Sequence, residues 1–80
     1  MRVVKEINHP ICKVTIFNWN SKYLIKLEQG DIEQTFKIDE MDVLEEKDLD
    51  EVLNESFMKA AQKRFKEMHD ALEGATEHLL

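Results

Sequence analysis

Hydrophobic and polar residues alternate along three consecutive segments of the chain, 11–18, 22–28 and 31–38. Alternation with a period of two, in segments rich in β-branched and aromatic residues, is typical of strands that bury one face. The connections between these segments are short, so we expect the strands to pair as consecutive antiparallel neighbours. Residues 2–7, which precede a turn at Asn8–Pro10, are a candidate for a short fourth strand.

The parity of the apolar positions limits how the first two strands can pair. A slip of one residue would turn the common apolar face outwards, so only every second register is acceptable. One register pairs Ile16 with Tyr23 and leaves Trp19–Asn20 as the loop, whereas the other pairs Ile16 with Ile25 and makes Asn20–Ser21 the loop. Both registers remain open at this point.

The second hairpin has a clearer preference. A Gly30–Asp31 loop places glycine first, as a type II′ turn prefers. The alternative, Gln29–Gly30, requires a positive φ at glutamine, which is unfavourable. We therefore predict the Gly30–Asp31 loop.

From residue 49 onwards, apolar residues recur at spacings of three and four instead of two. This rhythm predicts one amphipathic helix over about 49–73. Asp48 is its expected N-cap and Gly74 its expected stop, because glycine readily adopts the left-handed conformation that ends many helices. Such a helix would be about 37 Å long and a strand of eight residues about 27 Å, so we expect the helix to extend past the sheet.

These elements predict a single α+β domain over residues 1–80. Its two layers are an antiparallel three-stranded meander over about 11–38, with a fourth strand if 2–7 pairs, and one long C-terminal helix; an acidic connection, 39–48, joins them. The expected core residues of the sheet are Cys12, Val14, Ile16, Tyr23, Ile25, Leu27, Ile32, Phe36 and Ile38. Those of the helix are Leu49, Val52, Leu53, Phe57, Ala60, Ala61, Phe65, Met68 and Leu72.

Charge is distributed unevenly along the chain. The net charge is −6, but residues 1–37 carry a net +2 and residues 38–80 a net −8. The acidic balance argues against a general nucleic-acid binder and leaves room for a mildly basic patch in the first half. A single cysteine fits a reducing compartment, and there is no apolar run of a secretory signal or membrane span, so we expect a cytoplasmic protein.

The residue types that carry chemistry are sparse. Cys12 lies on the predicted core face and is expected to be an inert thiol. His9 and Cys12 form a His-x-x-Cys pair with no second pair to complete a zinc site. The acids of 39–51 do not match a calcium-binding loop, and two glycines cannot build a phosphate-binding loop. We expect no catalytic residue, no metal and no cofactor, and hence no enzyme.

The face of the predicted sheet opposite the core is the most informative candidate site. By strand parity it carries Phe17, Trp19 and Leu24 beside Lys13, Lys22 and Lys26, and also Ile11, Thr15, Thr35 and Lys37. Contiguous exposed apolar groups usually mark a partner site. Three interpretations are open: residues 2–7 or the helix end fold back over this face, the face is a protein interface, or it stacks and binds single-stranded nucleic acid.

Four short motifs, Lys5–Ile7, Phe17–Asn20, Lys22–Leu27 and Glu33–Lys37, precede the acidic stretch and the helix. In this order the chain resembles a family of small uncharacterised bacterial proteins, which implies a bacterial, cytosolic setting and no assigned activity. A meander followed by one helix is also similar in layout to the Pur-alpha repeat, which binds single-stranded nucleic acid.

Together these observations lead to one expectation and one alternative. We expect a non-enzymatic interaction domain with no membrane association, forming a homodimer or binding another protein. The contact would be made through the outer sheet face or the part of the helix that extends past the sheet. The alternative is binding of single-stranded nucleic acid or another anionic ligand on the outer sheet face.

Overall fold

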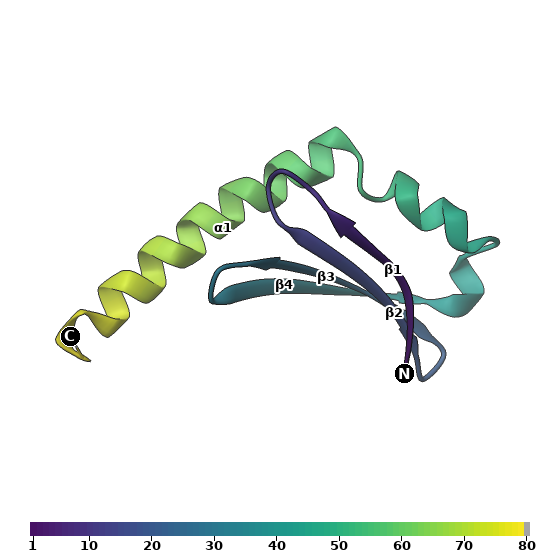
Figure 1. Cartoon of the computed structure of the whole chain (residues 1–80), viewed down its shortest axis with the longest axis horizontal. Helices are drawn as coiled ribbons and strands as arrows, with labels where there is room; N and C mark the ends of the chain where they lie inside the picture. The colour runs from purple at the N-terminus through teal and green to yellow at the C-terminus, as the bar shows by residue number, and fades with distance from the viewer. Residues whose placement is uncertain (80) are drawn as a thin grey trace.

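The computed structural model describes residues 1–79 and contains one four-stranded antiparallel sheet (Figure 1). The strands are β1 (Arg2–Asn8), β2 (Lys13–Trp19), β3 (Lys22–Gln29) and β4 (Ile32–Asp39). They lie in sequence order, β1-β2-β3-β4, so the predicted meander is confirmed and the candidate fourth strand forms one edge of it.

The first hairpin adopts the second of the two open registers. Ile16 pairs with Ile25, and Asn20 and Ser21 form the loop. Both loop residues have positive φ, 54° and 63°, as a type I′ turn requires. Trp19 is therefore the last residue of β2 and not a loop residue.

The second hairpin has the predicted Gly30–Asp31 loop, because Gln29 pairs with Ile32. Gly30 has a φ of +59°, a conformation that side chains rarely adopt. The ring of His69 lies 3.5 Å from the position that a Cβ of Gly30 would occupy. The turn therefore requires glycine for its backbone and also lies against the helix.

The predicted α+β fold with one long C-terminal helix is confirmed, and three short 3-10 helices accompany that helix. The helical segments are the short 3-10 helices η1 (Glu40–Asp42) and η2 (Glu46–Glu51), the long helix α1 (Glu55–Thr76) and a terminal 3-10 helix, η3 (Glu77–Leu79). Figure 1 shows η2 and α1 meeting at a bend above the sheet. No helix among residues 1–79 is long and apolar enough to cross a membrane.

The predicted start of the long helix was wrong. The side chain of Asn54 caps α1 by accepting a hydrogen bond from the backbone N–H of Phe57 at 2.9 Å. Asp48 lies inside η2, where its carboxylate accepts a hydrogen bond from the backbone N–H of Glu45 at 3.2 Å. The bend between η2 and α1 lets the chain follow the twisted sheet, so that Leu49 is buried against it.

The predicted stop was also wrong, because α1 continues through Gly74 to Thr76. Gly74 does not adopt a positive φ, and nothing lies within 4 Å of the position of a Cβ there. Figure 1 shows the C-terminal end of α1 extending past the β3–β4 turn, as expected from its length. We call residues 70–79 the helix overhang. Leu72, predicted to be in the core, lies on it and is 43% exposed.

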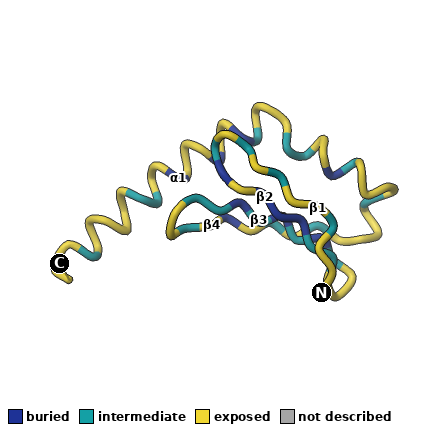
Figure 2. The backbone as a smooth tube through the Cα atoms, in the orientation of Figure 1, coloured by how far each residue is buried: buried dark blue, intermediate teal, exposed yellow. Residues whose placement is uncertain are grey.

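The core lies between the sheet and the helical layer. Its buried apolar residues are Cys12, Val14, Ile16, Tyr23, Ile25, Leu27, Leu49, Met58, Ala61 and Phe65. Met58 was not predicted, and the predicted Ala60 is exposed. Because α1 begins after the cap at Asn54, the side of the helix that faces the sheet is the one that carries Met58, Ala61 and Phe65. Figure 2 shows burial fading along α1 towards its C-terminus.

The remaining predicted core residues pack at the margin of this cluster. They are partly buried: Ile32, Phe36, Ile38, Val52, Leu53, Phe57 and Met68. The rings of Phe36 and Phe57 meet edge to face with centroids 5.1 Å apart.

One polar residue of β4 points into the core. Gln34 is buried; its Nε2 donates to the carbonyl oxygen of Ala61 at 3.0 Å, and its Oε1 accepts from Nε of Arg64 at 2.9 Å. The Arg64 guanidinium also lies 5.8 Å from the centroid of the Phe36 ring, within range of a cation–π interaction. A polar residue in the apolar alternation of β4 is thus satisfied by the helix it faces.

Ion pairs attach η2 to the edge strand β1. Arg2 pairs with Glu46, and Nζ of Lys5 lies 2.9 Å from a carboxylate oxygen of Asp50. The Tyr23 hydroxyl donates to Glu46 at 3.3 Å. The hydrogen bond from Arg2 is the main reason why the pKa of Glu46 is lowered. The acidic connection therefore complements the basic residues at the start of the chain.

Candidate interaction surface on the outer sheet face

The helical layer packs on one face of the sheet, which we call the inner face, and the opposite face is the outer face. Residues 2–7 form the edge strand β1 and do not fold back over the outer face. The core contacts of α1 and η2 are with the inner face, and the helix overhang projects past the end of the sheet (Figure 1). The interpretation in which the chain covers its own outer face is therefore wrong for residues 1–79.

Cross-strand pairing brings the apolar residues of the outer face together. Val3 pairs with Phe17, and Phe17 pairs with Leu24, so these side chains form one row across three strands. Trp19 lies on the same face in the next row. Val3 and Trp19 are each 51% exposed, and Phe17 and Leu24 are half-buried. We call these four residues the apolar patch.

The strand pairing also fixes the charges around the patch. The outer face carries four lysines, Lys13, Lys22, Lys26 and Lys37, and four acids, Glu6, Glu28, Glu33 and Asp39. This face is therefore neutral overall, whereas the sequence suggested a basic one. The expectation of a basic face counted the lysines and left out the acids. Of these acids, Glu6 lies on β1, Glu28 on β3, and Glu33 and Asp39 on β4.

Two of these lysines are already paired with acids. Lys22 forms an ion pair with Asp39. Nζ of Lys26 lies 3.2 Å from Glu33 and 3.7 Å from Glu28, and the hydrogen bond to Glu33 is the main reason why the pKa of Lys26 is raised. Lys13 has no ion pair within residues 1–79. Lys22, the cross-strand neighbour of Trp19, is thus neutralised within the chain.

Two residues depart from the expected outer face. Ile11 was placed there by parity, but it lies in the turn before β2 and packs against the core, and its carbonyl oxygen accepts a hydrogen bond from Gln29 at 2.8 Å. Val3 was not predicted. A register shift between Val3 and Lys5 changes the parity of β1, so alternation alone could not assign Val3 to this face.

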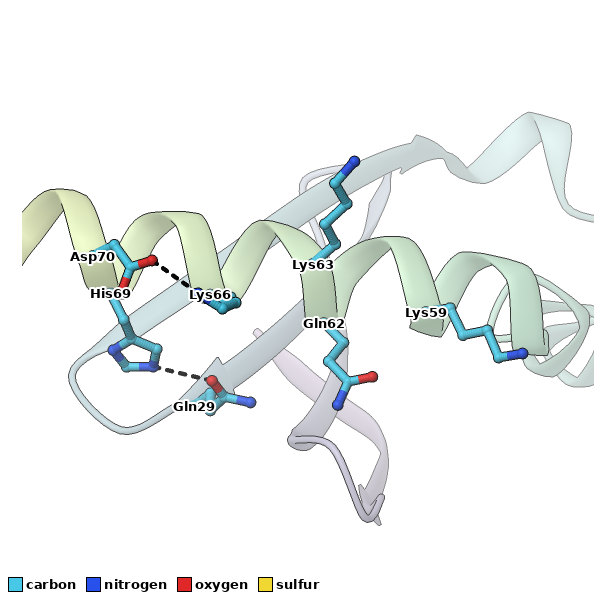
Figure 3. Close-up of a pocket in the computed structure, with 7 residues that line it drawn as sticks. All are labelled: Gln29, Lys59, Gln62, Lys63, Lys66, His69 and Asp70. Carbon is cyan, nitrogen blue, oxygen red and sulfur yellow. Dashed lines mark hydrogen bonds and ion pairs between the residues drawn. The ribbon is translucent and has the colours of Figure 1, made fainter.

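A cavity lies on another part of the molecule, between α1 and the end of β3. It is an open groove of about 600 Å³ lined by three lysines, two glutamines, His69 and Asp70. Its direct contacts are few: Nε2 of His69 lies 3.0 Å from Oε1 of Gln29, and Lys66 pairs with Asp70 at 3.2 Å. Figure 3 shows Lys63 and Gln62 pointing in opposite directions, so the lining side chains do not converge on one point.

Nucleophilic and metal-binding groups do not gather at any site. Cys12 is buried, and burial raises the pKa of its thiol, so it remains protonated and is a poor nucleophile. The Nδ1 atom of His9 accepts a hydrogen bond from the backbone N–H of Ile11 at 3.1 Å, and His78 is exposed in η3. Within the described part of the chain, no group of three or more His, Cys, Asp or Glu residues could hold a metal ion.

In comparisons with known proteins, no family model, no curated protein and no solved structure matches this chain.

Proposed function

We propose that this protein is a non-enzymatic interaction domain that forms a homodimer through the outer face of its sheet. The observation that carries the proposal is the apolar patch, in which two aromatic and two aliphatic side chains lie together with nothing covering them. Aromatic residues are enriched at protein interfaces because they bury a large area at low entropic cost. A second sheet packed on this face would complete a sandwich.

Charge favours a protein partner over nucleic acid. Single-stranded nucleic acid binds where aromatic side chains lie in a positively charged groove. Here the lysines of the outer face are matched by an equal number of acids, and Lys22 and Lys26 are held in ion pairs. The net charge of −6 adds long-range repulsion.

The helix overhang is the second apolar surface that could support self-association. Leu72 and Leu79 are exposed on it. They are single side chains about two turns apart along the chain, with Glu73 and Glu77 between them. The apolar patch of the sheet is contiguous, includes two aromatic rings and lies on a rigid surface, so it is the stronger candidate.

Sedimentation across a concentration range tests the proposal. The outer face is about 19 Å wide and 25 Å long, which is small for a stable interface. We therefore expect the 9.5 kDa chain to shift from monomer to dimer at tens to hundreds of micromolar, as an interface of roughly this size allows. A monomer throughout that range would overturn the proposal.

Variants assign the contact to the patch. Phe17→Glu should weaken the dimer by about tenfold or more, because it places a charge between Val3 and Leu24 at the centre of the patch. The matched control is Met41→Glu, since Met41 is 90% exposed in η1 and lies outside the patch. Leu72→Glu tests the helix overhang in the same way. Circular dichroism should show all three variants folded, and a loss of association with Leu72→Glu alone would move the interface to the overhang.

Titration with a single-stranded oligonucleotide separates the two functions. Under the proposal, the fluorescence of Trp19 is unchanged by the oligonucleotide at low salt. Quenching that fades as salt is added would instead indicate nucleic-acid binding on the outer face.

A further inference from the structure

We infer that the two copies pack their outer faces about a two-fold axis parallel to the strands, so that Lys13 of each copy meets Glu28 of the other. This inference rests on the proposed homodimer and specifies its geometry. It follows from the cross-strand rows of the outer face and from the requirement that a two-fold interface be complementary to itself.

The symmetry leaves a small number of arrangements. Sheets packed face to face keep their strands within about 30° of one another. The two-fold axis between them is then either parallel or perpendicular to the strands. A parallel axis that runs between β2 and β3 keeps the whole sheet in contact. It places each row over the same row of the second copy, with β2 over β3 and β1 over β4. A perpendicular axis places each strand over itself with the order of the rows reversed.

The parallel axis brings the two central side chains of the apolar patch, Phe17 and Leu24, into contact between the copies. Phe17 and Leu24 occupy the same row on β2 and β3. Phe17 of one copy therefore lies over Leu24 of the other, and the symmetry repeats this contact. In the next row Trp19 lies over Lys22, an arrangement suited to a cation–π interaction.

The same axis pairs opposite charges at the other end of the sheet. Lys13 and Glu28 share a row on β2 and β3, so each Lys13 faces Glu28 of the second copy. Lys13 is the cross-strand neighbour of Glu28 in its own chain but forms no ion pair within residues 1–79, and the one ion pair of Glu28 there is with Lys26, at 3.7 Å. The dimer would thus supply a partner for a lysine that has none in the single chain, on both sides of the axis.

A perpendicular axis is less favourable at each of the three centres that keep the apolar patch in contact. Centred between the rows of Phe17 and Trp19, it pairs Lys37 with Asp39, but it overlaps only two of the four rows and leaves Lys13 and Glu28 outside the contact. The other two centres bring like charges together. Centred on the row of Phe17, it places Lys37 over Lys37 and Lys22 over Lys26. Centred between that row and the row of Thr15, it places Asp39 over Glu33. Like charges facing each other oppose association, so the parallel axis is favoured.

Charge reversal tests this arrangement between molecules. K13E and E28K should each weaken the homodimer by about tenfold or more, since each creates two facing pairs of like charge. An equimolar mixture of the two variants should recover the association of the unmodified protein, because every introduced charge then meets an opposite one. Mixing cannot repair a defect inside one chain, so recovery identifies an intermolecular pair.

The controls separate this inference from the proposed function. E55K and K59E reverse an ion pair of 2.8 Å on α1, away from the outer face, and should leave association unchanged alone and mixed. If the unmodified protein remains monomeric, the proposed function fails. If it dimerises but the mixture of K13E and E28K shows no recovery, the homodimer stands and the parallel axis is overturned.

Discussion

The two faces of the sheet are built from the same strands but have different environments. On the inner face Val14, Ile25 and Leu27 are fully buried, whereas on the outer face Phe17 and Leu24 are half-buried. These side chains are equally apolar, but the rest of the outer face carries four lysines and four acids, whereas the rest of the inner face is mostly apolar. A chain of this length supplies one helical layer, and that layer covers one face. Apolar residues on a sheet face therefore predict that something packs on that face. Whether the same chain does so depends on how many helices or strands it has.

The largest expected effect lies on the inner face. Phe65 belongs to α1 and is fully buried on the side of the helix that faces the sheet, so Phe65→Ala should lower the free energy of unfolding by about 3–5 kcal/mol. Leu72→Ala is the matched change on the helix overhang, where the side chain is 43% exposed, and it should cost less than about 1 kcal/mol. Urea denaturation monitored by circular dichroism measures both. Equal losses would contradict the boundary drawn between the covered and the projecting parts of α1.

An intermediate effect is expected from the buried polar contact. Gln34→Leu removes the hydrogen bonds to the Ala61 carbonyl and to Arg64 and should cost about 1 kcal/mol, because the helix still satisfies that carbonyl and water can reach the arginine. Its neighbour Thr35 is exposed on the outer face, and Thr35→Val should change stability by less than about 0.5 kcal/mol. Thermal or urea unfolding of the pair compares the two faces at adjacent positions, and a larger loss at Thr35 would contradict the assignment.

The smallest effect concerns pH. The pKa of Glu46 is lowered in the folded protein, chiefly by the hydrogen bond from Arg2. A carboxylate whose pKa is lower when folded contributes stability above its unfolded value, about 4.3, and loses it as the pH falls through the folded value. Unfolding free energy should therefore decline below about pH 5. Glu46→Gln should make this decline shallower, and an identical pH profile would exclude the pair as a source of stability.

The sequence alone was sufficient to predict the strands and the second hairpin loop, because these depend on neighbouring residues. Strand alternation predicted the meander, and the preference of Gly30 for positive φ predicted the second loop. The first loop stayed open between two registers because Asn20 and Ser21 are ordinary turn residues in either one. The structure selects the register in which both adopt positive φ.

The bend before α1 and the position of Val3 could not be predicted, because they depend on contacts between distant parts of the chain. The apolar rhythm from Leu49 onwards continues across the bend at Asn54, so it does not reveal that the chain turns to follow a twisted sheet. Parity identified the outer face and also places Glu28 and Glu33 on it. Glu6 and Asp39, which lie outside the three alternating segments, are placed there only by strand pairing, and they make the face neutral. The position of Val3 depends on a register shift that alternation cannot detect.

The register shift in β1 also affects how readily another strand could add to the edge of this sheet. An exposed edge strand presents unpaired backbone groups to which another chain can add. Here the irregularity between Val3 and Lys5 interrupts one edge, and Glu33, Lys37 and Asp39 place charges along the other. Growth by adding strands is thereby discouraged at both ends of the sheet. In the homodimer that we propose, association through the outer faces would close after two copies, so the assembly would be finite.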